Sequence, residues 1–329
     1  MTDKKIIKNG MTEEQLLDLC ADKNNHPFFR GAPYWTAEIY SFGKYIRKYG
    51  YYPKFLPLAI YTDHGAGRIE NKPYKDTLET DAPTMFYHSP ESVKIWKKFS
   101  KKPCYAFFSP FVFCRRINKI EKSDQAKGTI AFPTHMTADI DDLSDMKKYI
   151  EDLKALPEKF QPVSVCLHMT DVRKGRHKIF MENGLPVFTA GGNSAGFADR
   201  FYGILKNFAY ATSNLIGSTT YYSVEMGVQF FIYGDKPILI NNGDANVPAG
   251  EYDFYAGHKH YQELHKMFST LDCGITDEKR KVIEYDLGVY DGVSRLKMSW
   301  LLYSSLFKWI FSAAFIRWSS DTFKKIIKA

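Results

Sequence analysis

The chain has 329 residues, of which 44% are hydrophobic and 16% aromatic, and its formal net charge at pH 7 is +8. This composition excludes a disordered protein, and the length suits one large domain or, more naturally, two domains of ordinary size. The start of the chain, MTDKKIIKNGMTEEQ, lacks the apolar run of a secretory signal. Its five cysteines are scattered and lack CxxC spacing, which predicts reduced thiols in a cytoplasmic protein and excludes a disulfide framework or zinc site.

The positive charge is concentrated at the C-terminal end. Residues 295–329 contain seven Lys and Arg and one Asp, a net charge of +6, which leaves +2 for the rest of the chain. A general nucleic-acid-binding protein usually spreads its basic residues over the whole body. The charge distribution therefore argues against a nucleic-acid partner.

The first half alternates strand-like and helix-like segments. The helix with the clearest start is SPESVKIWKKF, in which Ser89 can cap the amino end and Pro90 occupies the first turn. Such alternation predicts a parallel α/β sheet. The predicted helices are 13–22, 36–48 and 90–99, and the predicted strands are 55–62, 82–89 and 103–113.

The second half repeats this alternation more regularly, which predicts a doubly wound sheet. The charged segment 117–127 lacks periodicity and is the expected linker. We therefore predict an α/β protein of GT-B architecture, with two Rossmann-like domains that face a central cleft. The predicted domains are 1–120 for the acceptor, 121–285 for a nucleotide-sugar donor and 286–329 as a C-terminal helical segment. The predicted strands are 128–135, 163–169, 186–192, 209–214 and 228–234, and the helices are 142–156, 172–184, 198–208 and 218–227.

The stretch YATSNLIGSTTYYSVEMG predicts an anion site. A strand ends at Ser213 and Asn214, a turn follows at Gly217, and a helix begins at Ser218, Thr219 and Thr220. Backbone N–H groups and hydroxyls at a helix amino end bind phosphate well. The structural alternative is that Ser218 only caps the helix.

Several of these stretches follow one another in an order known from enzymes. A first-half strand ends at Asp63-His64-Gly65, IAFPTH (130–135) follows the linker, the next strand ends in VCLHM (165–169), and the Ser-Thr turn comes last. This order resembles that of the GT-B transferases and polymerases of bacterial surface polysaccharides. That group includes the CDP-glycerol glycerophosphotransferases of teichoic acid synthesis and the CMP-Kdo and CMP-sialic acid transferases. Its usual His-Pro pair is His168-Met169 here.

The resemblance implies that His64 is the general base that deprotonates an acceptor hydroxyl, with Asp63 orienting the imidazole. A pKa near 6.5 suits histidine to that role. An inverting displacement is the simpler expectation, because one base and direct attack need no covalent intermediate. The alternative is a turn histidine whose polar atoms are satisfied by the backbone.

The resemblance also implies a donor site in the second domain. There, histidines at strand ends would donate hydrogen bonds to the phosphates of a CMP-, CDP- or UDP-linked sugar. The structural alternative for Glu225 is an exposed glutamate. The structural alternative for the turn at Gly192 and Asn193, called the Gly-Asn turn, is an ordinary glycine loop. The predicted donor-site residues are Thr134, His135, His168, Gly192, Asn193, Ser213, Asn214, Gly217, Ser218, Thr219, Thr220 and Glu225.

No metal or other cofactor is expected. The acids of ADIDD (138–142) precede a predicted helix, where they favour the positive end of its dipole. The histidines of GHKHYQELH (257–265) lack the i, i+4 spacing of a helical zinc site.

The basic, aromatic C-terminal segment predicts an amphipathic helix on the inner face of the cytoplasmic membrane. Tryptophans would lie at the headgroup level and lysines toward anionic lipid. Each lysine or arginine near the surface would contribute about 1 kcal/mol to the free energy of membrane binding. Alternatively, the apolar stripe packs on the protein. The predicted membrane-contacting residues are Lys308, Trp309, Arg317, Trp318, Lys324, Lys325 and Lys328.

These features favour a membrane-peripheral glycosyltransferase that modifies a cell-surface glycan or lipid-linked acceptor, in capsule or lipopolysaccharide synthesis. Two alternatives remain open. A non-hydrolysing nucleotide-sugar epimerase shares the two sheet domains, although its soluble substrate requires no membrane. A non-catalytic subunit that binds a nucleotide-sugar or glycan is the other alternative.

Overall fold

The computed structural model describes residues 9–328, with side chains for residues 9–321. The chain forms two compact units. Unit 1 contains the residues up to Asn25 together with Arg115–Gly192 and Phe197–Ile283, and unit 2 contains His26–Cys114, Asn193–Gly196 and the residues from Glu284 onward. The first predicted domain boundary, at 120, lies near the change of unit at 114–115. In contrast, the residues before His26 belong to unit 1 and the C-terminal helices to unit 2.

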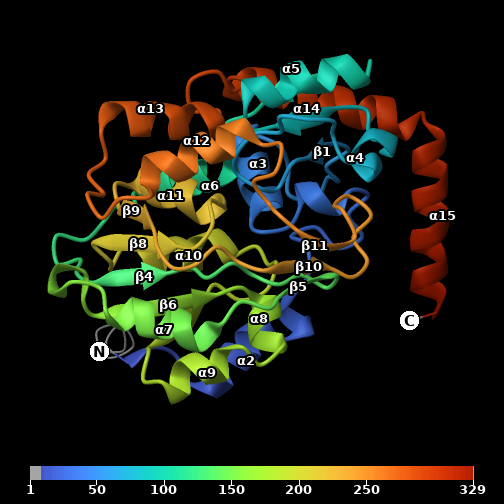
Figure 1. Ribbon diagram of the computed structural model, residues 1–329. Helices are drawn as coiled ribbons and strands as arrows, with labels where there is room; N and C mark the ends of the chain where they lie inside the picture. Colours follow the sequence, from blue (N-terminus) through green and yellow to red (C-terminus); the bar gives the residue numbers. More distant parts are fainter. Residues whose placement is uncertain (1–8, 329) are drawn as a thin grey trace. The chain divides into compact units, whose positions relative to one another are not determined.

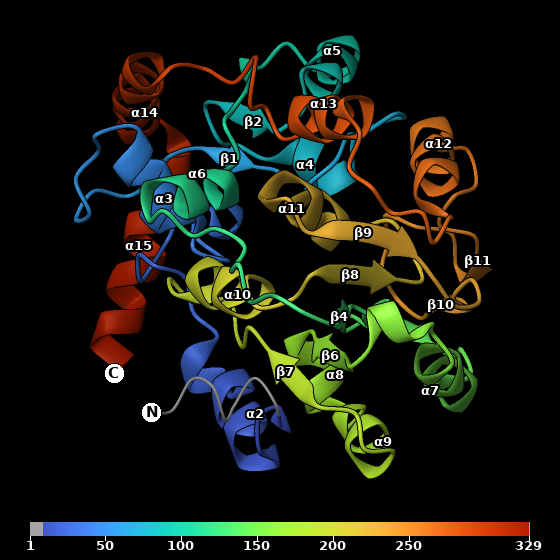
Figure 2. The same ribbon diagram turned by 90° about the vertical axis from the view of Figure 1, so that its left-hand side faces the viewer.

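Unit 1 is built on a parallel sheet of five strands in the order β7-β6-β4-β8-β9 (Figures 1 and 2). The order reverses between β4 and β8, which makes the sheet doubly wound, as predicted for the second half of the chain. The strands are β4 (Thr129–Ala131), β6 (Val163–Leu167), β7 (Val187–Thr189), β8 (Tyr210–Ser213) and β9 (Gln229–Ile232).

Helices cover both faces of this sheet. On one face, α7 (Met146–Lys154), α8 (Met169–Arg173), α9 (His177–Glu182) and α2 (Glu13–Cys20) bury a shared apolar core with the strands. On the other, α10 (Phe197–Leu205), α11 (Ser218–Met226) and α12 (Lys259–Phe268) contribute aromatic contacts such as those of Phe132 with Phe201 and of Phe230 with Phe268. The helix α2 was predicted within the first domain. It packs instead on β7 and α8 of unit 1.

A second sheet in unit 1 is antiparallel, in the order β11-β10-β5. Its strands are β5 (Ile140–Asp142), β10 (Leu239–Asn241) and β11 (Gly250–Tyr252). Residues 140–142 therefore form a strand, and the helix predicted over 142–156 begins only at Met146, as α7. Short 3-10 turns at η1 (Asp22–Asn24) and η3 (Glu158–Phe160) complete the unit.

Unit 2 contains a parallel sheet of three strands, β1 (Tyr61–Thr62), β2 (Met85–Tyr87) and β3 (Cys104–Ala106). The helix α5 (Pro90–Phe99) begins as predicted, because the Ser89 side chain accepts a hydrogen bond from the Glu91 N–H. Residues 103–113, predicted as one strand, divide into β3 and α6 (Pro110–Ile117). Unit 2 also contains α4 (Lys75–Glu79), and α13 (Asp277–Asp286) continues into it from unit 1.

The predicted helix 36–48 is broken in two. The 3-10 turn η2 (Trp35–Ala37) precedes α3 (Phe42–Tyr49), and between them Tyr40 and Ser41 have φ angles of +49° and +69°. Left-handed backbone is costly for residues with a side chain, and it persists only where surrounding contacts enforce it. Here the Ser41 N–H donates to the Ser194 carbonyl at 3.1 Å.

The chain ends in two helices, α14 (Arg295–Ile310) and α15 (Ala313–Lys328), rather than in one. Within the described residues, no single helix has both the length and the apolar character needed to cross a bilayer. In the same described part of the chain, the pair formed by α14 and Ala313–Asp321 passes that test together, and the two helices are bent by 79°.

Candidate functional site

The carboxyl ends of β4 and β8, where the strand order of unit 1 reverses, are joined by hydrogen bonds. The Thr134 N–H and hydroxyl both donate to Oδ1 of the buried Asn214, each at 2.9 Å. Ligands of doubly wound sheets bind just outside this edge. Thr134, Ser213 and Asn214 thus lie at this edge of the sheet, and both Ser213 and Asn214 are buried.

The helix α11 begins immediately beyond β8. Gly217 is its N-cap, and the Gly217 N–H donates to the Thr220 hydroxyl at 3.3 Å. Thr220 is buried, whereas Gly217, Ser218 and Thr219 are partly exposed. A Cβ added at Gly217 would meet nothing within 4 Å. Gly217 therefore faces open space at the amino end of α11.

Two imidazoles follow the neighbouring strands β4 and β6. The ring centroids of His135 and His168 are 4.6 Å apart. The Thr170 N–H donates to Nδ1 of His168 at 3.3 Å, so the ring proton is on Nε2, which is a donor. Burial, and then the nearby His135, hold the pKa of His168 well below its usual value. His135 is exposed, and loss of hydration around its ring lowers its pKa too.

A buried ion cluster fixes the loop that carries His135. Arg176 donates to the Thr134 carbonyl at 2.7 Å and to the carboxylates of Asp171 and Asp142. Asp171 also accepts from the Met136 N–H at 3.1 Å. The backbone on both sides of His135 is thereby hydrogen-bonded to buried charged side chains. Neither Arg176 nor Asp171 was identified from the sequence.

Glu225 does not lie in the donor site. Its carboxylate is buried and accepts hydrogen bonds from Arg115 and Arg116, with the shortest N–O distance at 2.6 Å. Both carboxylate oxygens are engaged by the two guanidinium groups. The prediction of Glu225 as a donor-site residue is therefore wrong.

The predicted Gly-Asn turn is also divided. The Gly192 N–H donates to the Leu19 carbonyl at 2.9 Å, and a Cβ on Gly192 would lie 2.8 Å from the Asn24 carbonyl. Gly192 is therefore covered by residues 19–25 and not open to a ligand. Asn193 belongs to unit 2, where its side chain hydrogen-bonds the Tyr40 hydroxyl.

In unit 2, His64 follows β1 and is exposed. Asp63 is half-buried, and burial raises its pKa to about 6. Its carboxylate accepts from the Gly65 N–H at 3.3 Å and from the His64 backbone. Asp63 therefore shapes the turn that carries His64.

Two aromatic rings lie beside His64. Its ring centroid is 5.5 Å from that of Trp35 and 6.2 Å from that of Tyr40, and the Tyr40 ring is tilted by only 19°. Burial raises the pKa of Tyr40 to about 12. The phenol ring of Tyr40 lies nearly parallel to the imidazole. The left-handed backbone at Tyr40 and Ser41 costs conformational free energy, and it supports this placement of the ring beside His64.

His88, at the end of β2, was not singled out from the sequence. It is fully buried, 4.5 Å from Phe107 and 5.8 Å from Phe42 between ring centroids. No group among the described residues hydrogen-bonds either of its ring nitrogens. Burial, with a contribution from His64, lowers its pKa to about 3. His88 is thus a neutral, buried imidazole near the proposed base.

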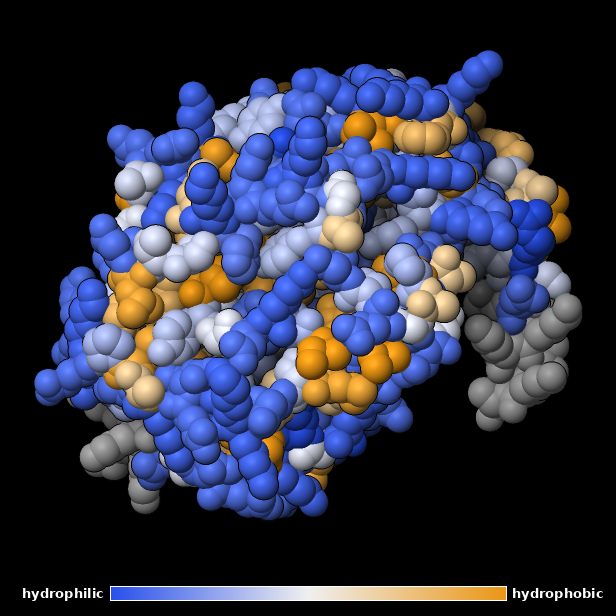
Figure 3. Space-filling model, viewed as in Figure 1, coloured by the Kyte–Doolittle hydropathy of each residue, from blue (hydrophilic) through white to orange (hydrophobic). Residues whose placement is uncertain are grey.

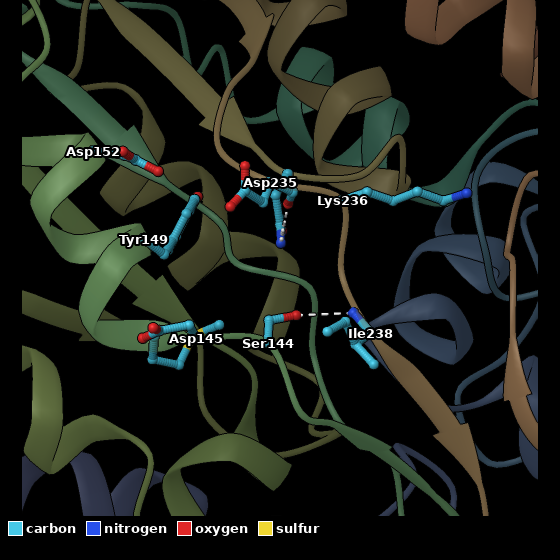
Figure 4. A pocket seen from close by; sticks show the side chains of 9 residues that line it. Ser144, Asp145, Tyr149, Asp152, Asp235, Lys236 and Ile238 are labelled. Atoms are coloured by element: carbon cyan, nitrogen blue, oxygen red, sulfur yellow. Dashed lines mark hydrogen bonds between the residues drawn. The ribbon is translucent and has the colours of Figure 1, made fainter.

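A small pocket of about 130 Å³ lies in unit 1 beside α7 (Figure 4). The Ser144 hydroxyl accepts from the Ile238 N–H at 2.9 Å at its rim. Pockets for nucleotide-sized ligands occupy about 300–1,000 Å³, so this one is too small to be a nucleotide site. It is lined by Ser144, Asp145, Met146, Tyr149, Asp152, Asn214, Asp235, Lys236 and Ile238. Within residues 9–321, no group of three or more His, Cys, Asp or Glu side chains is arranged to hold a metal ion.

The C-terminal residues predicted to contact a membrane lie differently. Trp309 is buried, so its prediction as a membrane contact is wrong. Trp318 packs against that core and donates to the Gly31 carbonyl at 2.7 Å, while Arg317 pairs with Asp81. Lys308 is exposed, and the side chains of Lys324, Lys325 and Lys328 lie outside the described residues.

A second apolar face of α14 is exposed instead. Apolar side chains are visible at the upper right of Figure 3, where Figure 1 draws the junction of α14 and α15. The exposed residues recur at intervals of three and four, so they share one side of the helix. They are Leu296, Trp300, Tyr303, Phe307 and Ile310, followed by Phe311. We call this set the α14 stripe.

Comparison with known proteins gives weak structural likenesses only. No family model matches the chain, and no match was found among curated proteins. Solved structures of the wall teichoic acid polymerase TagF are similar at TM-scores of 0.40 and 0.41 with 10% and 12% identity. They cover 77% and 76% of this chain and 68% and 69% of the TagF chain. A glycosyltransferase from Rickettsia africae ESF-5 is similar at a TM-score of 0.32 and 14% identity, over 76% of this chain and 70% of that one.

The polymerase TagF is of the kind that the sequence motifs resemble.

Proposed function

We propose that the chain is a GT-B-type transferase that moves a sugar or related unit from a nucleotide-linked donor to a hydroxyl of a surface glycan or lipid-linked acceptor. The observation that carries the proposal is the pair of imidazoles, His135 and His168, 4.6 Å apart at the ends of adjacent parallel strands. Both lie at the sheet edge where doubly wound folds bind nucleotides.

In this proposal unit 1 holds the donor. The Nε2–H of His168 and the ring of His135 donate to the diphosphate or monophosphate, and the open amino end of α11 supplies backbone N–H groups. As the bond between the anomeric carbon and the phosphate oxygen breaks, negative charge grows on the departing nucleotide. Fixed donors at that position stabilise the transition state more than the ground state. This role needs no metal ion.

Unit 2 supplies the base. The acceptor oxygen forms a bond to the anomeric carbon, its proton passes to His64, and the nucleotide leaves with the electron pair of the broken bond. His64 is suited to this step because it is exposed and its ordinary pKa is near neutrality. Direct displacement by one nucleophile inverts the configuration at the anomeric carbon.

We also propose that the α14 stripe holds the enzyme on an anionic membrane surface. The large apolar side chains of the stripe lie on a helix whose charged residues are all basic, among them the exposed Lys297 and Lys308. A helix that pairs two copies of a chain usually combines both signs of charge beside its stripe. Apolar side chains flanked by lysines favour anionic lipid.

The donor half of the proposal is tested by thermal unfolding of the full chain with CMP, CDP, UDP and GDP. Bound nucleotide stabilises the folded state in proportion to RT ln(1 + [L]/Kd), so at least one should raise Tm. His135→Ala and His168→Ala should remove that shift. Asp124→Ala, in the polar linker, serves as the control.

The catalytic half is tested with His64→Ala. We expect turnover to fall by 10²-fold or more, as for loss of a general base, while the nucleotide-induced shift in Tm is unchanged. If the wild type binds nucleotide but transfers nothing in any assay, the non-catalytic binding subunit becomes the better interpretation. Interconversion of free nucleotide-sugars without an acceptor would favour the epimerase.

A further inference from the structure

Trp35 exposes a large aromatic surface next to the proposed base. Its side chain is 52% exposed, although its ring centroid is only 5.5 Å from that of His64. Two other tryptophans, Trp96 and Trp309, are almost entirely buried. An indole that stays exposed on a structured element leaves unused a burial free energy of more than about 1.5–3 kcal/mol.

The turn that carries Trp35 is hydrogen-bonded to the strand that precedes His64. The turn η2 is held on β1 by two hydrogen bonds, because the Thr62 hydroxyl donates to the Thr36 carbonyl at 3.0 Å and the Thr62 N–H donates to the Thr36 hydroxyl at 3.4 Å. Both threonines are buried. Since Thr36 follows Trp35 and Thr62 precedes His64 by two residues, these bonds fix the spacing between the indole and the imidazole.

The other end of the turn is anchored as firmly. Glu38 is fully buried and receives a bidentate ion pair from Arg47, at 2.7 and 2.8 Å. Arg47 also donates to the Leu56 carbonyl at 2.8 Å. A Cβ on Gly43 would lie 1.9 Å from the Glu38 carboxylate, so only glycine leaves room for this pair. A rigid support therefore holds Trp35 before any ligand arrives, which lowers the entropy cost of binding.

We infer that Trp35 is an acceptor subsite that stacks a neutral pyranose ring and presents one of its hydroxyls to His64. The inference rests on the proposed function and adds the class of acceptor. The apolar face of a pyranose carries C–H bonds whose positive ends meet the negative face of an indole. A ring lying on the indole at about 3.5–4.0 Å extends sideways far enough to reach a group 5.5 Å from the indole centre.

The chemistry around His64 favours a sugar over an anionic polyol phosphate. The groups next to His64 include the rings of Trp35 and Tyr40, the neutral His88 and the carboxyl of Asp63. Each of these four is aromatic, neutral or acidic. Phosphate recognition relies on Arg, Lys or a helix amino end, whereas paired aromatic rings suit uncharged ring ligands.

The test measures binding directly, by saturation-transfer NMR on the full chain. The probes are the methyl pyranosides of glucose, galactose, mannose and N-acetylglucosamine, with glycerol 3-phosphate as the anionic comparison. We expect transfer to the C–H protons of one face of at least one pyranoside. The apparent Kd should rise about tenfold in Trp35→Ala, corresponding to about 1.4 kcal/mol, and change little in Trp35→Phe.

Phe99→Ala is the matched control. Phe99 is 49% exposed and lies at the end of α5, which leads to the opposite end of the parallel strands. It should bind pyranosides as the wild type does, and the Tm of each variant checks its folding. Unchanged pyranoside binding in Trp35→Ala overturns the inference, as does binding of glycerol 3-phosphate alone.

Failure of the inference is distinguishable from failure of the proposed function. If Trp35-dependent pyranoside binding is found without any transfer activity, the subsite stands and the transferase proposal fails. If transfer is found and Trp35→Ala leaves the acceptor KM unchanged, the transferase proposal stands and the subsite is wrong. His64→Ala should retain pyranoside binding while it loses transfer.

Discussion

Arg68 and Asp286 form a buried ion pair across 218 residues of sequence, with both Nε and a terminal nitrogen of Arg68 at 2.9 Å from one carboxylate oxygen. Asp286 is fully buried, and Arg68 ends the DHGAGR turn that carries His64. The pair therefore attaches that turn to the C-terminal end of α13.

Arg68→Met should reduce the free energy of unfolding by about 3 kcal/mol or more, because it removes the guanidinium that pairs with the buried Asp286 carboxylate and so leaves that charge without Arg68. The double variant Arg68→Met/Asp286→Leu should recover much of that loss, since it removes both charges. Urea denaturation measures each value. Lys75→Met is the control, because the pair of Lys75 with Glu79 is exposed and should contribute less than about 1 kcal/mol. Equal losses in the single and double variants would show that the ion pair is not the cause.

Nucleotide binding should strengthen as the pH falls from 8 to 6. The pKa of His135 is held below its ordinary value in the free protein, and a bound phosphate would raise it. Binding would then be coupled to proton uptake, which acid favours. Calorimetry in two buffers of different ionisation enthalpy counts those protons. Proton uptake that persists in His135→Asn would contradict this origin.

Gly217→Ala should weaken nucleotide binding without destabilising the protein. A Cβ there meets no protein atom within 4 Å, and the φ of −156° is open to any residue. The new methyl group would occupy space in front of the amino end of α11, where the phosphate approaches. Gly203→Ala, also without a neighbour within 4 Å, is the control. Thermal unfolding with and without nucleotide gives both quantities. Unaltered affinity would mean that phosphate binds elsewhere.

His88→Phe should flatten the dependence of stability on pH in acid. The folded-state pKa of about 3 lies below the ordinary value of 6.5, so the unfolded chain binds more protons and stability falls as the pH drops below 6.5. Between pH 7.5 and 5.0 this term amounts to about 2 kcal/mol. Asp63 acts in the opposite direction, because its raised pKa of about 6 makes stability fall as pH rises from 4 to 6. Comparing the free energies of unfolding of the wild type and His88→Phe at each pH cancels the contribution of Asp63. If the two stability–pH curves run parallel, His88 is not the source of the acid sensitivity.

Phe307→Ser/Phe311→Ser should weaken sedimentation with vesicles of phosphatidylglycerol and phosphatidylcholine by tenfold or more. The two side chains are 65% and 76% exposed, so their loss should not affect folding. Phe55→Ser, at 74% exposure outside α14, is the control. Binding should also fall with added salt, because lysines contribute. If the double variant sediments as the wild type does, the α14 stripe is not the membrane contact.

The features of the fold that depend on neighbouring residues were predictable. Ser89 and Pro90 identified the start of α5, and alternation of strands and helices identified the doubly wound sheet of unit 1. The strand β5 was missed because its partner β10 lies about a hundred residues away and no local pattern reports that pairing. Residues 107–113 form an apolar run, which periodicity alone does not assign to a strand or a helix.

The same limit applies to the side chains. Glu225 was expected in the donor site because nothing near it in the sequence points to its partners Arg115 and Arg116, which are 110 and 109 residues away. Along α14 both faces are apolar, so sequence spacing could not show that Trp309 faces the core and Phe307 faces outward. His88 could not be identified because its burial depends on Phe42 and Phe107, from other elements.

The buried side of α14 limits how the chain can be shortened. Met298, Leu301, Leu302 and Trp309 lie in the interior of unit 2, and the Ser305 and Thr84 hydroxyls are 2.7 Å apart beside β2. Deleting the basic tail from residue 295 onward would therefore strip interior contacts from the unit that carries His64, so a truncated protein that lost activity would have lost its fold first. Point substitutions on the outer side of α14 are the way to separate attachment from turnover.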